Sequence, residues 1–117
     1  MSTIAKPRVL SDFGPNTEDV LLIIRRMVSA LTPKAIILFG SRARGEARAD
    51  SDVDLLVVWR DENPPAFRAA EVRRGIGRQS LPMDVAVVTP REFDSLRARR
   101  AHIVGIAARE GIFVHGA

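Results

Sequence analysis

The sequence contains no cysteine, and its only histidines, His102 and His115, stand far apart. The absence of cysteine excludes a disulfide framework and a thiolate zinc site. Two separated histidines do not predict a histidine metal cluster. The sequence therefore excludes disulfide-stabilised folds and the commonest zinc sites.

Long apolar runs are also missing, since the longest aliphatic run covers only Val20 to Ile24, too short to span a bilayer. Residues 1–9 lack the apolar core of a signal peptide. A hydrophobic content of 46% is nevertheless typical of a globular chain, and 117 residues suit one domain with a sizeable core. We therefore expect a cytoplasmic protein with a loose N-terminal arm over residues 1–15 and a single domain over residues 16–117.

Lysine is scarce, with two residues against sixteen arginines, and the formal net charge is +4. Such a charge attracts triphosphate, nucleic acid or an acidic partner, although ordinary solvated faces of an arginine-rich chain explain it equally well. Aromatic residues are few, five Phe and one Trp, and they do not alternate with basic residues as in nucleic-acid-binding platforms. We expect nucleic-acid binding to be at most weak and non-specific.

Hydrophobic spacing predicts helices that alternate with strands. A first helix is predicted from Asn16, whose side chain would form a capping box with Asp19, to the stop at residues 32–33. Later helices are predicted from Pro65 to about Arg74, and from residue 89 to residue 109 with a break near residues 99–102. Strands are predicted at the apolar runs, residues 35–39, 52–59, 81–88 and 112–114. This alternation predicts an α/β or α+β sandwich around a small mixed sheet.

The polar insert between the first two strands carries the candidate chemistry. Asp52 and Asp54 lie two residues apart at the start of a strand, so their side chains point to the same face. Two carboxylates held so close repel each other, and a divalent cation, usually Mg²⁺ with phosphate, relieves the repulsion. At the other end of the insert, Gly40 allows a close backbone approach, and Ser41 can begin a helix that extends as far as Arg48. Because helix N-termini bind phosphate, the insert suits a metal-bound nucleoside triphosphate.

Three other motifs fail on individual residues. The two glycines of the insert have the spacing of a phosphate-binding P-loop, but Glu46 and Ala47 stand where that loop needs Lys and Ser or Thr. The aspartates at positions 50, 52 and 54 match part of an EF-hand loop, but Leu55 replaces its glycine and Asp61 its final glutamate. The sequence also does not predict a dinucleotide fold, because no Gly-x-Gly-x-x-Gly fingerprint follows the first strand.

Asp84 is a lone acid in an otherwise apolar strand, on the face that Ala86 and Val88 share. A buried carboxylate is costly unless it is paired or bound to metal, which indicates a third member of the acidic set. The alternative is a capping or turn acid at the start of the strand.

The segments Gly-Ser-x-Ala-Arg-Gly at residues 40–45 and Ser-Asp-x-Asp-Leu at residues 51–55 resemble the signature of the DNA polymerase β-like nucleotidyltransferase superfamily. More closely, they resemble its minimal nucleotidyltransferase (MNT) branch, in which the domain stands alone in prokaryotes. The resemblance extends from about Asn16 to Val114 and implies the polymerase β-like nucleotidyltransferase fold. Larger members carry a further domain that binds the nucleobase or the acceptor, for which we expect no room in this chain.

The resemblance implies nucleotidyl transfer from ATP with two Mg²⁺ ions, or Mn²⁺ in their place. Asp52 and Asp54 would hold the metal that carries the triphosphate. Together with Asp84 they would hold the second metal, which lowers the pKa of the attacking hydroxyl. These three aspartates are thus the candidate catalytic and metal-binding residues.

The nucleotide-binding residues implied by the same resemblance lie at the other end of the insert. Gly40 and Ser41 would bind the β- and γ-phosphates. Arg44, together with Arg42, would neutralise the charge on the leaving pyrophosphate. For these arginines, a solvated helix position is an equally good interpretation.

Members of this branch resemble antitoxins that are paired with a HEPN-type ribonuclease toxin. Some transfer AMP to a toxin tyrosine, and others neutralise the toxin by binding it. The complete acidic set favours an enzyme that adds AMP to a hydroxyl of such a partner, over a non-catalytic binding module or, more weakly, a basic nucleic-acid-binding protein. The segment over residues 68–78 carries candidate docking charges for an acidic patch, which would otherwise form a solvated face: Arg68, Arg73, Arg74 and Arg78.

Overall fold

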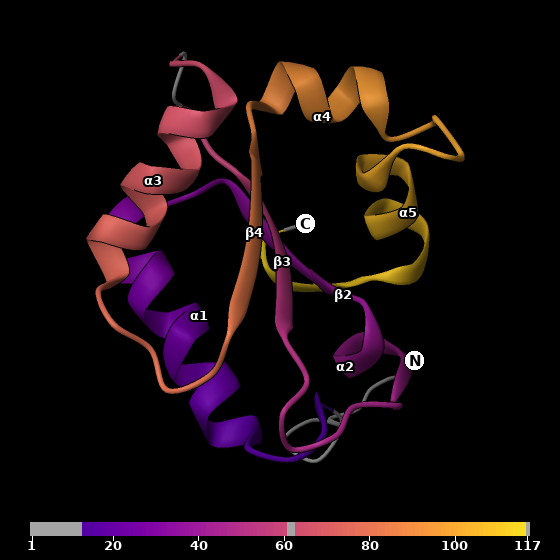
Figure 1. Cartoon of the computed structure of the whole chain (residues 1–117). Coiled ribbons are helices and arrows are strands. Elements are labelled where there is room, and N and C mark those ends of the chain that lie inside the picture. Colours follow the sequence, from indigo (N-terminus) through magenta and orange to yellow (C-terminus); the bar gives the residue numbers. More distant parts are fainter. Residues whose placement is uncertain (1–12, 61–62, 117) are drawn as a thin grey trace.

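The computed structural model describes residues 13–60 and 63–116 (Figure 1). Most of the predicted arm over residues 1–15 lies outside this part of the chain. The elements follow one another as α1 (Thr17–Leu31), β2 (Ala35–Phe39), α2 (Ser41–Arg44), β3 (Val53–Val58), α3 (Pro65–Ile76), β4 (Met83–Val88), α4 (Pro90–Leu96), α5 (Ile103–Glu110) and β5 (Ile112–His115). The predicted strands agree with these bounds to within two residues. The helix of the insert is shorter than predicted, because Gly45 ends it in a left-handed conformation.

The strands form one mixed sheet in the order β4-β3-β2-β5. β3 runs parallel to β4 and antiparallel to β2, and β2 runs antiparallel to β5. β2 and β3 are therefore central strands, which explains why both read as continuous apolar runs. Helices flank this small mixed sheet, as predicted for an α/β or α+β sandwich (Figure 1).

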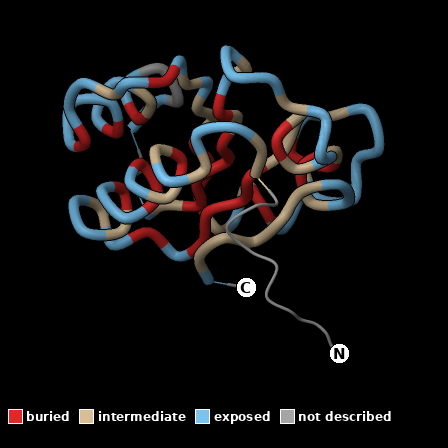
Figure 2. Tube along the Cα trace, turned by 90° about the horizontal axis from the view of Figure 1, so that it is seen from below, coloured by how far each residue is buried: buried red, intermediate tan, exposed pale blue. Residues whose placement is uncertain are grey.

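The two faces of the sheet bury separate apolar clusters between the layers (Figure 2). Leu55 and Val57 of β3 pack with residues of α1 and α3, whereas Leu56 and Val58 pack with residues of α4 and α5. Because strand side chains alternate, Asp54 lies on the α4/α5 face. This alternation fixes the side of the sheet on which the candidate chemistry stands.

The start of α1 differs from the prediction. Asn16 adopts a left-handed conformation, with φ of 65°, and its side chain makes no capping hydrogen bond, so the predicted capping box with Asp19 is wrong. Instead the Asn16 amide donates to the carbonyl of Ala49 at 3.2 Å. A long-range contact with the insert has therefore replaced the local cap. The predicted stop is confirmed, because α1 ends at Leu31 and Thr32 is its C-cap.

The arginines of α3 differ in their surroundings, and two of them contact β4. Arg68 is only 4% exposed, so it cannot be a docking charge, and that prediction is corrected. Its guanidinium donates to the carbonyl of Val87 and forms a bidentate pair with Glu92. Arg73 donates to the carbonyl of Met83 at 3.1 Å. α3 therefore covers the outer side of β4 with guanidinium groups.

Glu92 links this arginine to the capping box that starts α4. Its carboxylate accepts from Arg68 at 2.6 and 3.1 Å and from the backbone N–H of Thr89 at 2.9 Å. The Arg68 hydrogen bond, followed by that of Thr89, holds the pKa of Glu92 below its ordinary value of 4.5. Because the folded pKa is lowered, this stabilisation is complete above pH 4.5 and is lost as the pH falls through the folded pKa.

Replacing Glu92 with glutamine should lower the free energy of unfolding at pH 7 by about 1 kcal/mol, because the buried Arg68 loses its charged partner. The loss of stability on acidification should also be smaller than in the wild type. Chemical denaturation at pH values from 3 to 7 measures both effects. Glu71→Gln removes an exposed pair with Arg74 and is the matched control, with an expected change below about 0.5 kcal/mol. Equal pH dependence in wild type and Glu92→Gln would contradict the prediction.

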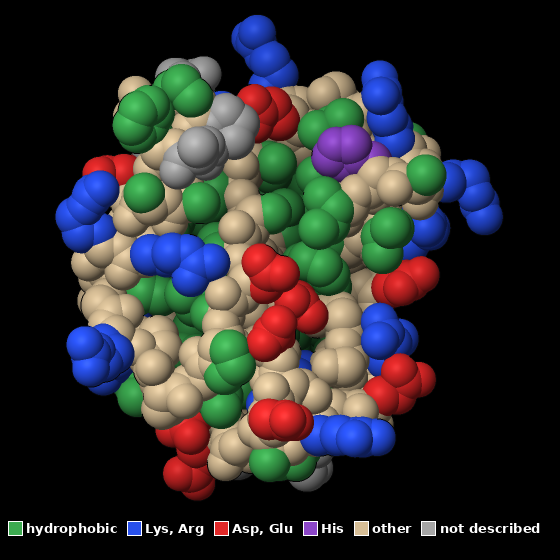
Figure 3. Space-filling view, in the orientation of Figure 1, with side chains coloured by type: hydrophobic (Ala, Val, Ile, Leu, Met, Phe, Trp, Pro, Cys, Tyr) green, Lys and Arg blue, Asp and Glu red, His purple; other side chains and the backbone are tan. Residues whose placement is uncertain are grey.

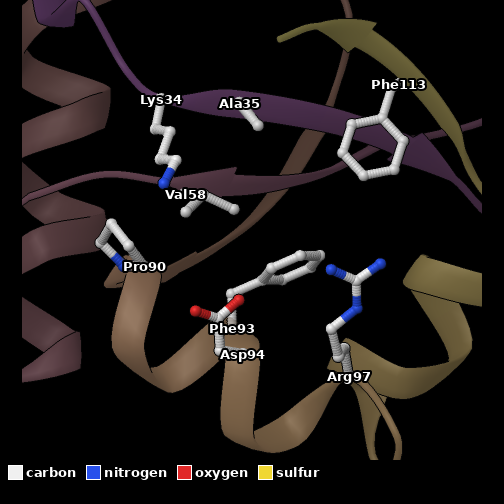
Figure 4. A pocket seen from close by; sticks show the side chains of 8 residues that line it. All are labelled: Lys34, Ala35, Val58, Pro90, Phe93, Asp94, Arg97 and Phe113. Atoms are coloured by element: carbon white, nitrogen blue, oxygen red, sulfur yellow. The ribbon is translucent and has the colours of Figure 1, made fainter. Parts of the chain in front are cut away.

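A small cavity of about 90 Å³ lies at the far end of the α4/α5 face from the aspartates (Figure 4). Ala35 and Val58, which pair across β2 and β3, line its floor. The ring of Phe93 meets Phe113 edge to face at 6.5 Å between centroids, and the guanidinium of Arg97 lies 4.9 Å from its centroid. The cavity is too small for a nucleotide, and its contacts anchor α4 to the sheet.

Within the described residues, no helix combines the length and the apolar character needed to cross a membrane.

Candidate functional site

Three aspartates meet at one end of the α4/α5 face. Asp54 on β3 pairs in register with Asp84 on β4, and Asp52 directly precedes β3. One carboxylate oxygen from each residue lies within 4.8 Å of the others. Figure 3 shows acidic side chains gathered near the middle of the view. The structure thus brings together the three acids that the sequence singles out, and we call them the aspartate triad.

The electrostatics of the triad favour a cation. The pKa of Asp54 is raised above its ordinary value of 3.8, first because the carboxyl is partly buried, and then because Asp84 and Asp52 repel its charge. Arg44 opposes this by attraction. Asp52 and Asp84 are exposed and Asp54 is half-buried, so a ligand can reach all three. Carboxylate oxygens at this spacing are the ligands that Mg²⁺ prefers, and the triad therefore fits a hard divalent cation.

Gly40 carries the backbone from β2 into α2 directly beside Asp54. Its φ of 77° and ψ of −156° are accessible almost only to glycine. A Cβ atom at this position would lie 2.2 Å from Oδ2 of Asp54, so no side chain can fit between the strands' ends here. Ser41 begins α2, whose first N–H groups have no partner within the helix. Gly40 and Ser41 therefore stand next to the triad, where the sequence predicts phosphate binding.

Arg42 does not lie on the surface of this site, although the sequence suggested a nucleotide contact. It is fully buried, and its guanidinium donates to the carbonyls of Phe13, Pro15 and Ser51 at 2.9, 2.6 and 3.0 Å. These bonds tie the segment before α1 to the loop that leads into Asp52. The sequence contained a signal of this role, because residues two apart in a helix point in nearly opposite directions. Arg42 and Arg44 could not both face a ligand.

Replacing Arg42 with methionine should lower the free energy of unfolding by about 3 kcal/mol, because three carbonyls lose their donors while the buried volume is roughly kept. Arg44→Met is the matched control: this neighbour is about half exposed and pairs with Glu46 at 2.9 Å. The control should change stability by less than about 0.5 kcal/mol. Urea denaturation of the two variants checks the prediction, and equal midpoints would contradict it.

Arg44 is an exposed arginine of the insert and lies near the triad. Its Nε donates to Oε1 of Glu46, and its charge lowers the pKa of Asp54, so it stands within electrostatic reach of the triad. The predicted contact of Arg44 with a leaving pyrophosphate is compatible with this position and stays a prediction.

The family of this chain follows from its similarity to known proteins. The sequence profile described as "Nucleotidyltransferase domain" matches residues 18–113, a range that overlaps every element from α1 to β5. The chain belongs to the nucleotidyltransferase domain family. The family assignment agrees with the fold, and it identifies the chain as a transferase by its domain.

Two relatives of this nucleotidyltransferase domain are informative. The chain is 50% identical over 34 residues to a protein of Methanocaldococcus jannaschii named "Putative protein adenylyltransferase MJ1379". That match spans 29% of this chain and 34% of the relative, so it covers about a third of the relative's length. A crystal structure described as a "putative nucleotidyltransferase from Sulfolobus solfataricus" superposes with a TM-score of 0.56 over 82% of this chain and 76% of that chain, at 23% identity. The second likeness supports the fold alone.

Some residues of the nucleotidyltransferase site region were not predicted from the sequence. Ser51 supports the loop before Asp52 through its carbonyl, which accepts from Arg42, and its hydroxyl, which accepts from the N–H of Arg48 at 2.8 Å. His102 lines a groove on the same face of the sheet as Asp84. Ser51 stands in the motif at residues 51–55, but that motif does not indicate its supporting hydrogen bonds, and His102 reaches the groove only through the tertiary fold.

Proposed function

We propose that this nucleotidyltransferase domain transfers AMP from ATP, in a Mg²⁺-dependent reaction, to a hydroxyl of a partner protein. The observation that carries the proposal is the aspartate triad beside Gly40, an arrangement of carboxylates and closely approaching backbone that suits a metal-bound triphosphate. The relative named as a protein adenylyltransferase supports the choice of a protein as acceptor. Following the resemblance to MNT antitoxins, the partner is a HEPN-type toxin and the acceptor a tyrosine.

The residues of the site have distinct parts in this proposal. Asp52 and Asp54 would hold the metal ion bound to the triphosphate, and Asp84 would join them at a second ion. Two Mg²⁺ ions, or Mn²⁺, would supply charge neutralisation at the attacking and leaving oxygens. Gly40 and Ser41 bind the β- and γ-phosphates through backbone N–H groups.

The transfer itself is a displacement at the α-phosphorus of ATP. The acceptor oxygen forms a bond to the α-phosphorus, the bond from that phosphorus to the oxygen bridging to the β-phosphate breaks, and pyrophosphate leaves. The proton of the hydroxyl passes to the carboxylate of Asp84, which lies at the outer strand of the triad. Arg44 stabilises the charge on the departing pyrophosphate. These 117 residues contain no tyrosine, so a tyrosine acceptor is not among them.

The test is to co-express the protein with the product of its neighbouring gene and to weigh that product by mass spectrometry. A gain of one or more AMP units, absent when Asp54 is replaced by asparagine, supports the proposed enzyme. Neutralisation of a toxic partner that survives Asp54→Asn without added mass supports the non-catalytic binding module instead. Calorimetry with ATP and Mg²⁺ separates the binding of nucleotide from its transfer.

A further inference from the structure

An open groove of about 510 Å³ runs along β4, the edge strand that carries Asp84, and is lined by residues from both faces of that strand. Its floor is β4, and its walls come from α3, α4 and the start of α5. The lining is mainly apolar: Ala69, Val85, Ala86, Val87, Val88, Leu96, Ile103 and Val104, with Glu92 and His102. We call this surface the β4 groove. Figure 3 shows hydrophobic side chains directly beside the acidic group in this view.

The groove begins beside Asp84, which is the member of the triad on β4. Ala86 and Val88 share the strand face of Asp84, and Ala86 lies two residues, or about 7 Å, further along β4. Gly40 lies on the other side of the triad, at the end of β2, and β3 separates the two. The order across the sheet is therefore Gly40, Asp54, Asp84, with the groove on the Asp84 side.

This order has a consequence that rests on the proposed function. In an in-line displacement, the attacking oxygen approaches the phosphorus from the side opposite the leaving group. With the β- and γ-phosphates at Gly40, the leaving pyrophosphate lies on the β2 side. The acceptor hydroxyl then has to arrive from the β4 side, where the groove is.

We propose that the β4 groove seats the acceptor segment of the partner protein, an extended stretch in which apolar or aromatic side chains and acidic residues surround the modified tyrosine. The apolar floor suits such side chains, because each would bury against β4. Ile103 is 46% exposed at the groove and offers apolar surface to an occupant. The partner is thus recognised next to the reacting hydroxyl. Binding of the segment in the groove also holds that hydroxyl in place.

The polar side chains of the groove, His102 and Glu92, further restrict which residues of the partner can bind there. The Nδ1 atom of His102 accepts from the N–H of Val104 at 3.1 Å, so a neutral ring carries its proton on Nε2. Among the described residues, Nε2 has no hydrogen-bond partner and can donate to a carbonyl or carboxylate. Glu92 does not repel acids, since Arg68 pairs with its carboxylate.

Charge next to the groove favours acidic residues. The loop between α4 and α5 contains Arg99 and Arg100, which are exposed and have no ion pair among the residues described. Leu96 and His102, at the two ends of this loop, line the groove. Acidic residues beside the acceptor tyrosine would meet these guanidinium groups, and their attraction would weaken as salt is added.

The experiment measures the binding of fluorescein-labelled tyrosine peptides by fluorescence polarisation, with the full chain, Mg²⁺ and a non-hydrolysable ATP analogue. The peptides carry acidic, basic or neutral residues beside an apolar-flanked tyrosine. Acidic peptides should bind tightest, and Ile103→Glu should weaken their binding by at least about tenfold, because apolar contact is lost and like charge is introduced. Ile103→Glu is expected to fold, since an acid at the first position of α5 interacts well with the helix dipole.

The matched control is Leu22→Glu on α1, an apolar residue of similar exposure that packs on the opposite side of the sheet. It should leave peptide binding unchanged, whereas the Arg99→Glu, Arg100→Glu double variant should remove the preference for acidic peptides. The affinity for ATP, measured by calorimetry, should be the same in all variants within about twofold. A loss of ATP affinity in Ile103→Glu would show that the groove holds the nucleobase and would overturn the inference.

The remaining outcomes separate this inference from the proposed function. Peptide binding that is absent, indifferent to charge, or equal in wild type and Ile103→Glu would overturn the docking inference, even where ATP binds. Groove-dependent peptide binding by a wild-type protein that does not bind ATP would support the docking surface and contradict the proposed enzyme.

Discussion

Replacing Asp54 with asparagine is expected to reduce AMP transfer by at least about 10² to 10³-fold, while the metal-free protein becomes more stable. The loss follows from the removal of the charge at the centre of the triad that would hold the proposed metal ion. The gain in stability follows from electrostatics, since burial and the charges of Asp84 and Asp52 raise the pKa of Asp54. Single-turnover kinetics and thermal unfolding in EDTA measure the two effects.

The gain in stability of metal-free Asp54→Asn over the wild type should depend on pH in a definite direction. Between the ordinary pKa of 3.8 and the raised folded pKa, the folded protein binds more protons at Asp54 than the unfolded chain does. The stability of the metal-free wild type therefore falls as the pH rises through this interval. Asp54→Asn should lack that fall, and its advantage over the wild type should be largest above the folded pKa.

Asp50→Asn is the matched control, because Asp50 is an exposed acid of the same insert and makes the same change in net charge. It should leave both transfer and metal-free stability nearly unchanged. Transfer that persists in Asp54→Asn at the wild-type rate would show that the triad is not the metal site. If Asp54→Asn were less stable than the metal-free wild type, only the electrostatic argument would be contradicted, and not the proposed metal site.

Replacing Gly40 with alanine should be nearly as damaging to transfer as the loss of Asp54. The new Cβ would lie 2.2 Å from Oδ2 of Asp54, so the carboxylate has to move from its place beside Asp84. The backbone at φ of 77° and ψ of −156° is also strained for alanine, and we expect the free energy of unfolding to fall by about 2 to 3 kcal/mol. Denaturation and binding of Mg²⁺–ATP measure the two consequences.

The control variant Gly45→Ala places alanine at a positive φ without a collision between its Cβ and a neighbouring atom. Gly45 has the same φ of 77°, but a Cβ there would meet nothing within 4 Å. It should cost about 1 kcal/mol of stability and leave Mg²⁺–ATP binding unchanged. In an Asp54→Ala background, the cost of Gly40→Ala should shrink, because the colliding carboxylate is gone. Additive effects of Gly40→Ala and Asp54→Ala would show that the two positions do not interfere.

The sequence predicted the elements whose signals are local. Apolar runs and turn residues placed every strand of the sheet, and the helix predicted from residue 89 begins there as α4, with Thr89 as its N-cap. The aspartate triad could also be predicted, because strand alternation puts Asp52 and Asp54 on one face and makes the lone Asp84 conspicuous. Local periodicity and the cost of burying a charge were sufficient for these features.

Features that depend on distant segments could not be predicted in the same way. The capping box at Asn16 was a sound local pattern, but a hydrogen bond to Ala49 replaced it. Arg42 and Arg68 belong to basic stretches that suggest ligand or partner contacts, yet the fold buries both of them. An arginine's burial is decided by which carbonyls and carboxylates the tertiary structure brings to it, and no local rule contains that information.

The guanidinium groups on the outer side of β4 have a consequence for assembly. An outermost strand offers free backbone groups on which another chain can add a strand, a route to self-association and aggregation. Here Arg73 occupies the carbonyl of Met83, and Arg68 that of Val87, so main-chain pairing along β4 is obstructed at both ends. A partner cannot extend the sheet here and has to be recognised through its side chains, which ties specificity to the chemistry of the docked residues.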